Sequence, residues 1–142
     1  MRLEIKESLI DQAPLQYSKD FHEWPEAWMG FDEDLVTGEI IIKGFAQFIK
    51  SLVEEGLSKK TIKNHMKNLW FLGSEIIREV HFDEDQRKLS SKKLLLMHVN
   101  EGGGPSVHQW NYNNKTDCNH IASYDSTCSM LFNFIKTCKM TH

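Results

Sequence analysis

The sequence lacks the features of a membrane or secreted protein. Its apolar runs, such as residues 40–42 and 94–97, are far shorter than the roughly 18 residues that a membrane helix needs. The first seven residues mix charged and apolar side chains, which interrupts the apolar stretch that a signal peptide requires. We therefore expect a protein of the cytoplasm that makes no contact with membranes.

Cysteine is scarce and poorly spaced for a structural role. The chain has three, Cys118, Cys128 and Cys138, and an odd number without a Cys-x-x-Cys pair does not fit a disulfide framework. Cys118 and His120 together supply at most half of a structural zinc site, which needs four ligands. We expect small, partly buried thiols, no metal and no cofactor.

Signatures of catalysis are also missing. Ser126 lies near Tyr124 and His120 in the sequence, but it has neither a Gly-x-Ser-x-Gly elbow nor an ordered acid partner. The glycines of 102–104 lack the Gly-Lys-Ser/Thr ending of a phosphate loop. Glu75 and Glu79 lie one helical turn apart, and we expect that pair to be solvated. These absences predict that the chain is not an enzyme.

Charge divides the chain into two parts. Residues 1–37 hold three basic and nine acidic side chains (−6), whereas residues 38–142 hold fourteen basic and eleven acidic ones (+3), for a total of −3. The first part shows no sustained periodicity, but it carries Trp24, Trp28 and Phe31, which disordered tails seldom have. We interpret 1–37 as an irregular or briefly helical acidic arm that packs against one helical domain, 38–142.

Apolar side chains recur every three or four residues and predict an all-α fold. The expected helices are 38–55, 59–80, 90–100 and 121–139, the last of them the most buried because its apolar arc is wide. Gly56 is placed to end the first helix and Ser58 to cap the second, which makes a tight hairpin. The predicted core comprises Phe45, Phe48, Leu52, Leu69, Ile76, Leu131 and Ile135.

The start of the second helix is strongly basic. Four lysines and no acid lie between Gly56 and Ser74, and a helix N-terminus itself favours phosphate oxygens. Charge alone leaves a second interpretation open, an ordinary solvated helix face. The candidate DNA-binding residues are Ser58, Lys59, Lys60, Thr61, Lys63, Asn64 and Lys67.

A family resemblance rests on the same stretch. The pattern Gly56-Leu57-Ser58-x-x-Thr61-Ile62-x-x-His65, together with the helix before it, resembles the N-terminal core-binding domain of tyrosine recombinases and phage integrases. The likeness covers about residues 45–70 and leaves 1–37 uncovered. It implies a compact four-helix, SAM-like orthogonal bundle whose second helix starts against the DNA backbone and groove. More loosely, the chain is similar to small bacterial proteins made of this domain alone.

The chain departs from that family in its catalytic machinery. Strand exchange needs a separate domain with an arginine, a His-x-x-Arg and a nucleophilic tyrosine, whereas this sequence has three arginines and no His-x-x-Arg. Tyr124 falls in the predicted last helix of the binding domain, so it is not that nucleophile. The resemblance therefore implies duplex DNA binding through backbone contacts, without catalysis.

An alternative function is a protein-interaction or adaptor module that keeps the fold without binding DNA. The net charge of −3 and the isoelectric point near 6.1 favour it, because DNA-binding domains are usually basic. Its contact would be the arm, meeting a partner or a second copy through Trp24, Trp28 and Phe31. In the DNA-binding interpretation, the same arm is expected to cover part of the lysine face.

Overall fold

Three long helices and one short helix follow the apolar periodicity of the sequence. The computed structural model describes residues 13–111 and 114–137. The long helices are α3 (Asp34–Glu54), α4 (Lys59–Val80) and α6 (Lys115–Lys136), and the short one is α5 (Ser91–His98). Within the described ranges no strand occurs, and the only β-type pairing is one bridge between Asn100 and Gly103. The all-α prediction is confirmed.

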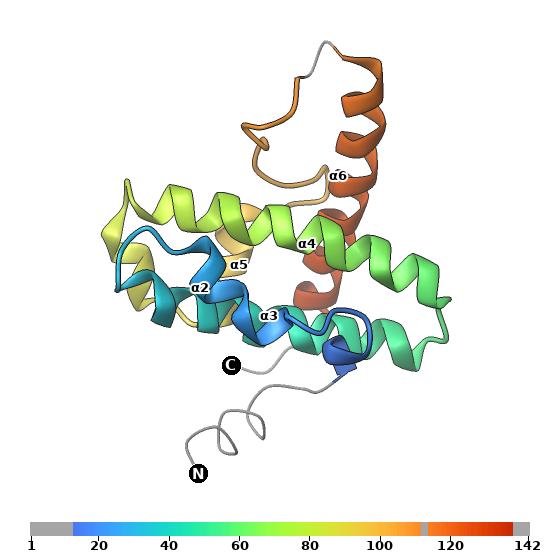
Figure 1. Cartoon of the computed structure of the whole chain (residues 1–142), viewed down its shortest axis with the longest axis horizontal. Helices are drawn as coiled ribbons and strands as arrows, with labels where there is room; N and C mark the ends of the chain where they lie inside the picture. Colours follow the sequence, from blue (N-terminus) through green and yellow to red (C-terminus); the bar gives the residue numbers. More distant parts are fainter. Residues whose placement is uncertain (1–12, 112–113, 138–142) are drawn as a thin grey trace.

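The hairpin between α3 and α4 forms where the sequence predicts it. Gly56 adopts a φ of 82°, a left-handed conformation that glycine reaches without steric cost. Ser58 then caps α4, because its Oγ accepts a hydrogen bond from the backbone N–H of Thr61 (3.1 Å). The two helices consequently run side by side in opposite directions (Figure 1).

The last helix crosses this pair steeply, and its first half extends beyond α4 (Figure 1). It begins at Lys115, six residues before the predicted start at 121, and its buried residues begin only at Tyr124. The prediction that this helix is the most buried is therefore wrong. A wide apolar arc buries little when half of the helix projects past its neighbours, and α3 and α4 each bury more residues. Residues 138–139 of the predicted helix, with Cys138, lie outside the described residues.

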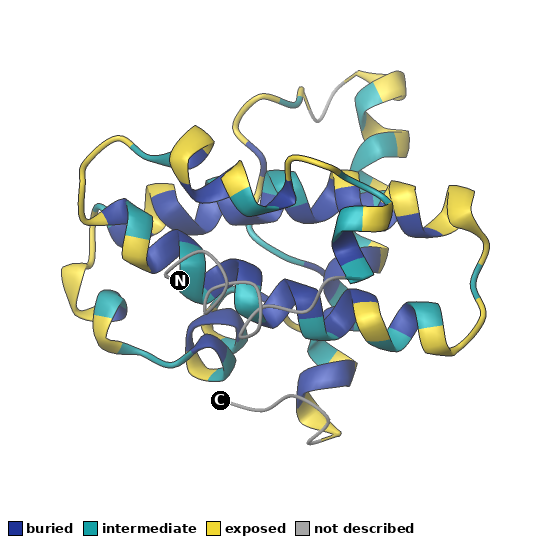
Figure 2. Ribbon diagram, turned by 60° about the horizontal axis from the view of Figure 1, so that its bottom comes forward, coloured by how far each residue is buried: buried dark blue, intermediate teal, exposed yellow. Residues whose placement is uncertain are grey.

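The arm supplies part of the core. A 3₁₀ turn (η2, Phe21–Glu23) leads into the short helix α2 (Trp24–Trp28), and Phe21, Trp24 and Trp28 are buried with the α3 and α4 side chains. All seven predicted core residues are buried as well, on the inward helix faces that Figure 2 shows in dark blue. The helix expected from 38 instead begins at Asp34, inside the predicted arm. Residues 1–12 of the arm lie outside the described residues.

Two shorter elements complete the fold. The 3₁₀ helix η1 (Ala13–Gln16) packs on α3, and η3 (Glu84–Lys88) links α4 to α5. None of the helices in the described part combines the length and the apolar character needed to span a bilayer.

Candidate nucleic-acid interface

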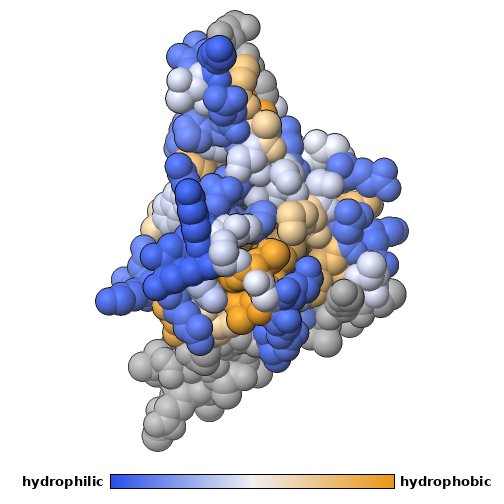
Figure 3. All heavy atoms as spheres, turned by 90° about the vertical axis from the view of Figure 1, so that its right-hand side faces the viewer, coloured by the Kyte–Doolittle hydropathy of each residue, from blue (hydrophilic) through white to orange (hydrophobic). Residues whose placement is uncertain are grey.

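All seven candidate DNA-binding residues lie at the exposed N-terminal end of α4. Ser58 and Thr61 also bind each other, because the Ser58 hydroxyl donates to Thr61 Oγ1 at 2.9 Å. As the acceptor of that bond, the Thr61 hydroxyl keeps its own proton available for a ligand. Figure 3 shows this end of the molecule, where hydrophilic side chains surround an apolar area.

The lysines of this face have no ion-pair partner among the described residues. Lys59, Lys60, Lys63 and Lys67 are exposed, and none forms an ion pair within residues 13–111 and 114–137. Lys88, in contrast, has Asp85 at 3.8 Å. The start of α4 therefore presents four ammonium groups beside a helix N-terminus, which is the arrangement that phosphate oxygens favour.

Asn64 contributes less to this face than the sequence predicts. Its Nδ2 donates to Ser123 Oγ on α6 at 2.9 Å, and Asn68, one turn later, donates to the same oxygen at 3.0 Å. Asn64 therefore helps to hold α6 across α4. The sequence analysis missed this contact, although the four-residue spacing of Asn64 and Asn68 is a usable signal for one helix face.

A buried polar seam continues from that contact. Thr127 on α6 donates to the Ser123 carbonyl (3.3 Å) and accepts from Asn68 Nδ2 (2.8 Å), while His65 Nδ1 lies 2.7 Å from the same hydroxyl oxygen. Burial lowers the pKa of His65, so its neutral form, with a proton on Nδ1, fits the site. Satisfied polar groups of this kind fix one packing of two helices, because any shift would leave them unpaired.

The arm lies beside the lysines and forms a groove with them. The groove has a volume of about 400 Å³ and is lined by Tyr17, Ser18, Asp20, Trp24, Lys63, Met66, Lys67 and Trp70. The sequence predicts both the lysines and the aromatic arm. It does not show that the arm lies against the Lys63–Lys67 side of α4, because that placement depends on contacts made more than forty residues along the chain.

Those contacts involve the tryptophans. Trp28 Nε1 donates to the Trp70 carbonyl at 3.2 Å, and the Trp24 and Trp70 rings meet edge to face at 5.5 Å. Trp24 and Trp28 are only 4% and 9% exposed. These two indoles, which the sequence analysis offered as contacts for a partner or a second copy, are buried in the chain's own core. Phe31, at 55% exposure, is the one arm aromatic of the predicted three that stays at the surface.

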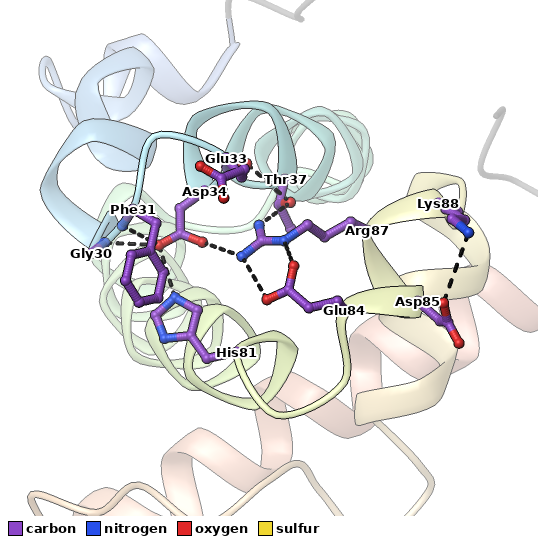
Figure 4. Close-up of polar contacts among 10 residues, drawn as sticks. All are labelled: Gly30, Phe31, Glu33, Asp34, Thr37, His81, Glu84, Asp85, Arg87 and Lys88. Carbon is purple, nitrogen blue, oxygen red and sulfur yellow. Dashed lines mark hydrogen bonds and ion pairs between the residues drawn. The ribbon is translucent and has the colours of Figure 1, made fainter.

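A buried carboxylate fixes the end of the arm to the body (Figure 4). Asp34 is fully buried and accepts bonds from the backbone N–H of Gly30 (2.8 Å) and Phe31 (3.0 Å), from His81 Nε2 (2.8 Å) and from an Arg87 terminal nitrogen (2.8 Å). Burial by itself raises the pKa of Asp34, but these donors outweigh it and hold the pKa well below its usual value. Asp34, the last residue of the acidic run Asp32-Glu33-Asp34, thus joins the end of the arm to α4 and η3.

A second buried carboxylate lies on the far half of α4. Glu75, expected to be solvated, is 4% exposed and accepts bonds from His108 through Nδ1 (2.6 Å) and the backbone N–H (3.3 Å). The prediction for Glu75 is therefore wrong, because the loop that precedes α6 folds over it. Glu79 is exposed, as expected.

Cys128 and Tyr124, which lie under that loop, are not poised to act as nucleophiles. Burial raises the pKa of Cys128 to about 12 and raises that of Tyr124 as well, so both stay protonated at neutral pH. The Tyr124 hydroxyl donates to the Pro105 carbonyl at 2.9 Å, which leaves its proton engaged. Among residues 13–111 and 114–137, no group of three His, Cys, Asp or Glu side chains is arranged to hold a metal ion.

Comparison with known proteins identifies no relative of this chain. No family model matches the chain, and neither a curated protein nor a solved structure matches it.

Proposed function

We propose that the chain is a non-catalytic, cytoplasmic module that binds duplex DNA through phosphate contacts from the start of α4. The observation that supports this function is a set of four exposed lysines, none of which forms an ion pair with the part of the chain that the structure describes: Lys59, Lys60, Lys63 and Lys67. The likeness of this stretch to core-binding domains of tyrosine recombinases points to the same surface. Because phosphates are the expected targets, binding is non-specific in sequence.

The lysine count sets the expected strength and salt dependence. Each neutralised phosphate of a duplex contributes about −0.9 to the slope of log affinity against log salt. Three or four contacts therefore give a slope of about −3 to −4. The overall charge of −3 opposes binding at a distance, so we expect weak binding that is measurable only at low salt.

Charge reversal tests the assignment. Replacing Lys60, Lys63 and Lys67 with Glu should abolish binding of a labelled duplex at 20 mM salt, while circular dichroism shows an unchanged helix content. A control of equal charge change replaces three exposed lysines elsewhere, Lys88, Lys93 and Lys136. If both triple variants bind equally well, the assigned face is wrong.

A second candidate function is protein interaction. A groove of about 220 Å³ between α3 and α6 is lined by four apolar residues, Phe48, Leu52, Met130 and Phe134, and by four polar ones, Ser51, Glu55, Asn133 and Thr137. Figure 3 shows an apolar area at this end of the molecule. A parent protein that binds no duplex even at 20 mM salt, and is not retained on heparin, would favour this function.

A further inference from the structure

The groove beside the lysines combines positively charged and aromatic side chains. One wall is a single face of α4, formed at successive turns by Lys63, Met66, Lys67 and Trp70. The other wall comes from the arm, whose lining residues are Tyr17, Ser18, Asp20 and, at the start of α2, Trp24. Its volume of about 400 Å³ falls within the range of small-molecule sites, roughly 300–1,000 Å³.

The aromatic side of the groove is partly open. Tyr17 and Trp70 are half-buried, whereas Trp24 is almost fully buried and supports Trp70 edge to face at 5.5 Å. Trp70 is further held by Trp28, whose ring centre lies 5.6 Å away. A ring fixed in this way offers a flat apolar contact at little entropic cost, which suits a planar ligand.

The cationic side of the groove faces one acid, Asp20, on the opposite wall. Lys63 and Lys67 lie one turn apart on α4, and neither forms an ion pair within the described ranges. A ligand that binds both the aromatic wall and the lysines needs a flat ring and a negatively charged group in the same small molecule. A nucleotide combines these two features.

We propose that the groove takes one unpaired nucleotide of a DNA strand, with its base against Tyr17 and Trp70 and its phosphate at Lys63 and Lys67. This inference rests on the proposed function, since it uses two of the same lysines. A base inside a duplex is stacked and paired, so it cannot enter without the cost of unstacking. The groove therefore gives the module a preference for single-stranded or frayed DNA over blunt duplex. A free nucleotide has the same chemistry, and the test separates the two sources.

Asp20 provides a discriminating variant. It is exposed, lines the groove and accepts a 2.5 Å hydrogen bond from the Ser18 hydroxyl. Its carboxylate repels a phosphate held by Lys63 and Lys67. Asp20→Asn removes that repulsion at nearly constant shape and should strengthen binding of a phosphate-bearing ligand. Because loss of any negative charge strengthens binding of a polyanion, the effect assigned to the groove is the gain of Asp20→Asn in excess of that of Glu26→Gln, an exposed acid outside the groove lining.

The experiment compares three probes at 20 mM salt, using the full chain. They are a short labelled single strand, a blunt duplex of the same length, and a deoxynucleoside monophosphate. Single-strand affinity should exceed duplex affinity severalfold. Lys63→Gln with Lys67→Gln should lower the single-strand salt slope by about 0.7, the value for the loss of one phosphate contact. Lys88→Gln with Lys93→Gln, the matched control, should leave it unchanged.

Aromatic contact has its own readouts. Tyr17→Ala should weaken single-strand binding about 5- to 150-fold, the range for loss of one base-stacking contact, and should affect duplex binding little. In ¹⁵N NMR spectra, the indole N–H signal of Trp70 should shift on adding the single strand. The signal of Trp110, which packs on Phe71 and Tyr124, serves as the internal reference.

The outcomes separate this inference from the proposed function. Duplex binding that depends on Lys60, with no single-strand preference and no gain in Asp20→Asn beyond that of Glu26→Gln, overturns the groove assignment and leaves the proposed function standing. Binding of the monophosphate alone, with the expected lysine and Asp20 effects, supports the groove as a free-nucleotide site and overturns the DNA function. No binding of any of the three probes overturns both.

Discussion

Alanine at Gly73 tests whether the arm is docked on α4 as described. A Cβ built at Gly73 lies 2.9 Å from Trp28 Cε2 and closer still to two other atoms of the same ring. At an exposed helical position, alanine is more favourable than glycine by about 1 kcal/mol. Here the rigid indole, held between Phe45 and Trp70, must retreat, and overpacking costs about 1–3 kcal/mol. Because three ring atoms are too close, we place the net loss near 2 kcal/mol.

Urea unfolding followed by circular dichroism measures that loss. With a slope of roughly 2 kcal/mol per molar urea, typical of small domains, the midpoint should fall by about 1 M. The cause is isolated by a double-mutant cycle with Trp28→Ala. In that background the clash is absent, so Gly73→Ala should be neutral or stabilising. A parent chain that tolerates Gly73→Ala without loss would show that Trp28 does not pack on α4, and the docking of the arm would be wrong.

Three further expectations concern other parts of the fold. Asp34→Ala should cost about 3–5 kcal/mol at pH 7, as removal of one partner from a buried ion pair does. The pKa of Asp34 is depressed in the folded state. Its contribution to the free energy of unfolding is therefore complete above about pH 4, the pKa of an unfolded Asp, and is lost as the pH falls further. Urea midpoints of parent and variant that decline in parallel from pH 4 to 2 would contradict this. Gly103→Ala should destabilise more than the neighbouring Gly102→Ala, because Gly103 has a φ of 141° and faces the Asp125 side chain; equal melting temperatures would refute the comparison. Leu69→Ala should cost about 3 kcal/mol, and a loss below about 1 kcal/mol would mean that this face of α4 is not core.

The helices α3 and α4 were predictable because their signals are local. Gly56 and Ser58 mark adjoining helix ends within three residues, and the boundaries of α4 match the prediction, 59–80. The start of α3 was missed because Asp34 satisfies its charge with Arg87, 53 residues away. Before that contact is known, an acidic run looks like a loop. Glu75 was misjudged for the same reason, since its partner His108 lies in a loop without periodicity.

The candidate interface divides in the same way. The lysine face follows from helical spacing alone, and the structure leaves those lysines exposed. The role of Asn64 could not be predicted, because it depends on where α6 crosses α4. The groove could not be predicted either, because no pattern in the sequence of the arm specifies which face of α4 the arm contacts.

The docking of the arm also has a consequence for how the chain is made. Trp28 leaves the ribosome 42 residues before Trp70, the residue whose carbonyl receives its indole hydrogen bond. At about 5–20 residues per second, that interval is roughly 2 to 8 seconds. Throughout it, the indoles of Trp24 and Trp28 have no α4 to bury them, so the nascent chain presents an exposed aromatic segment, which is a hazard for aggregation. Burial of both indoles has to wait for α4, where Gly73 leaves the space that the Trp28 ring occupies.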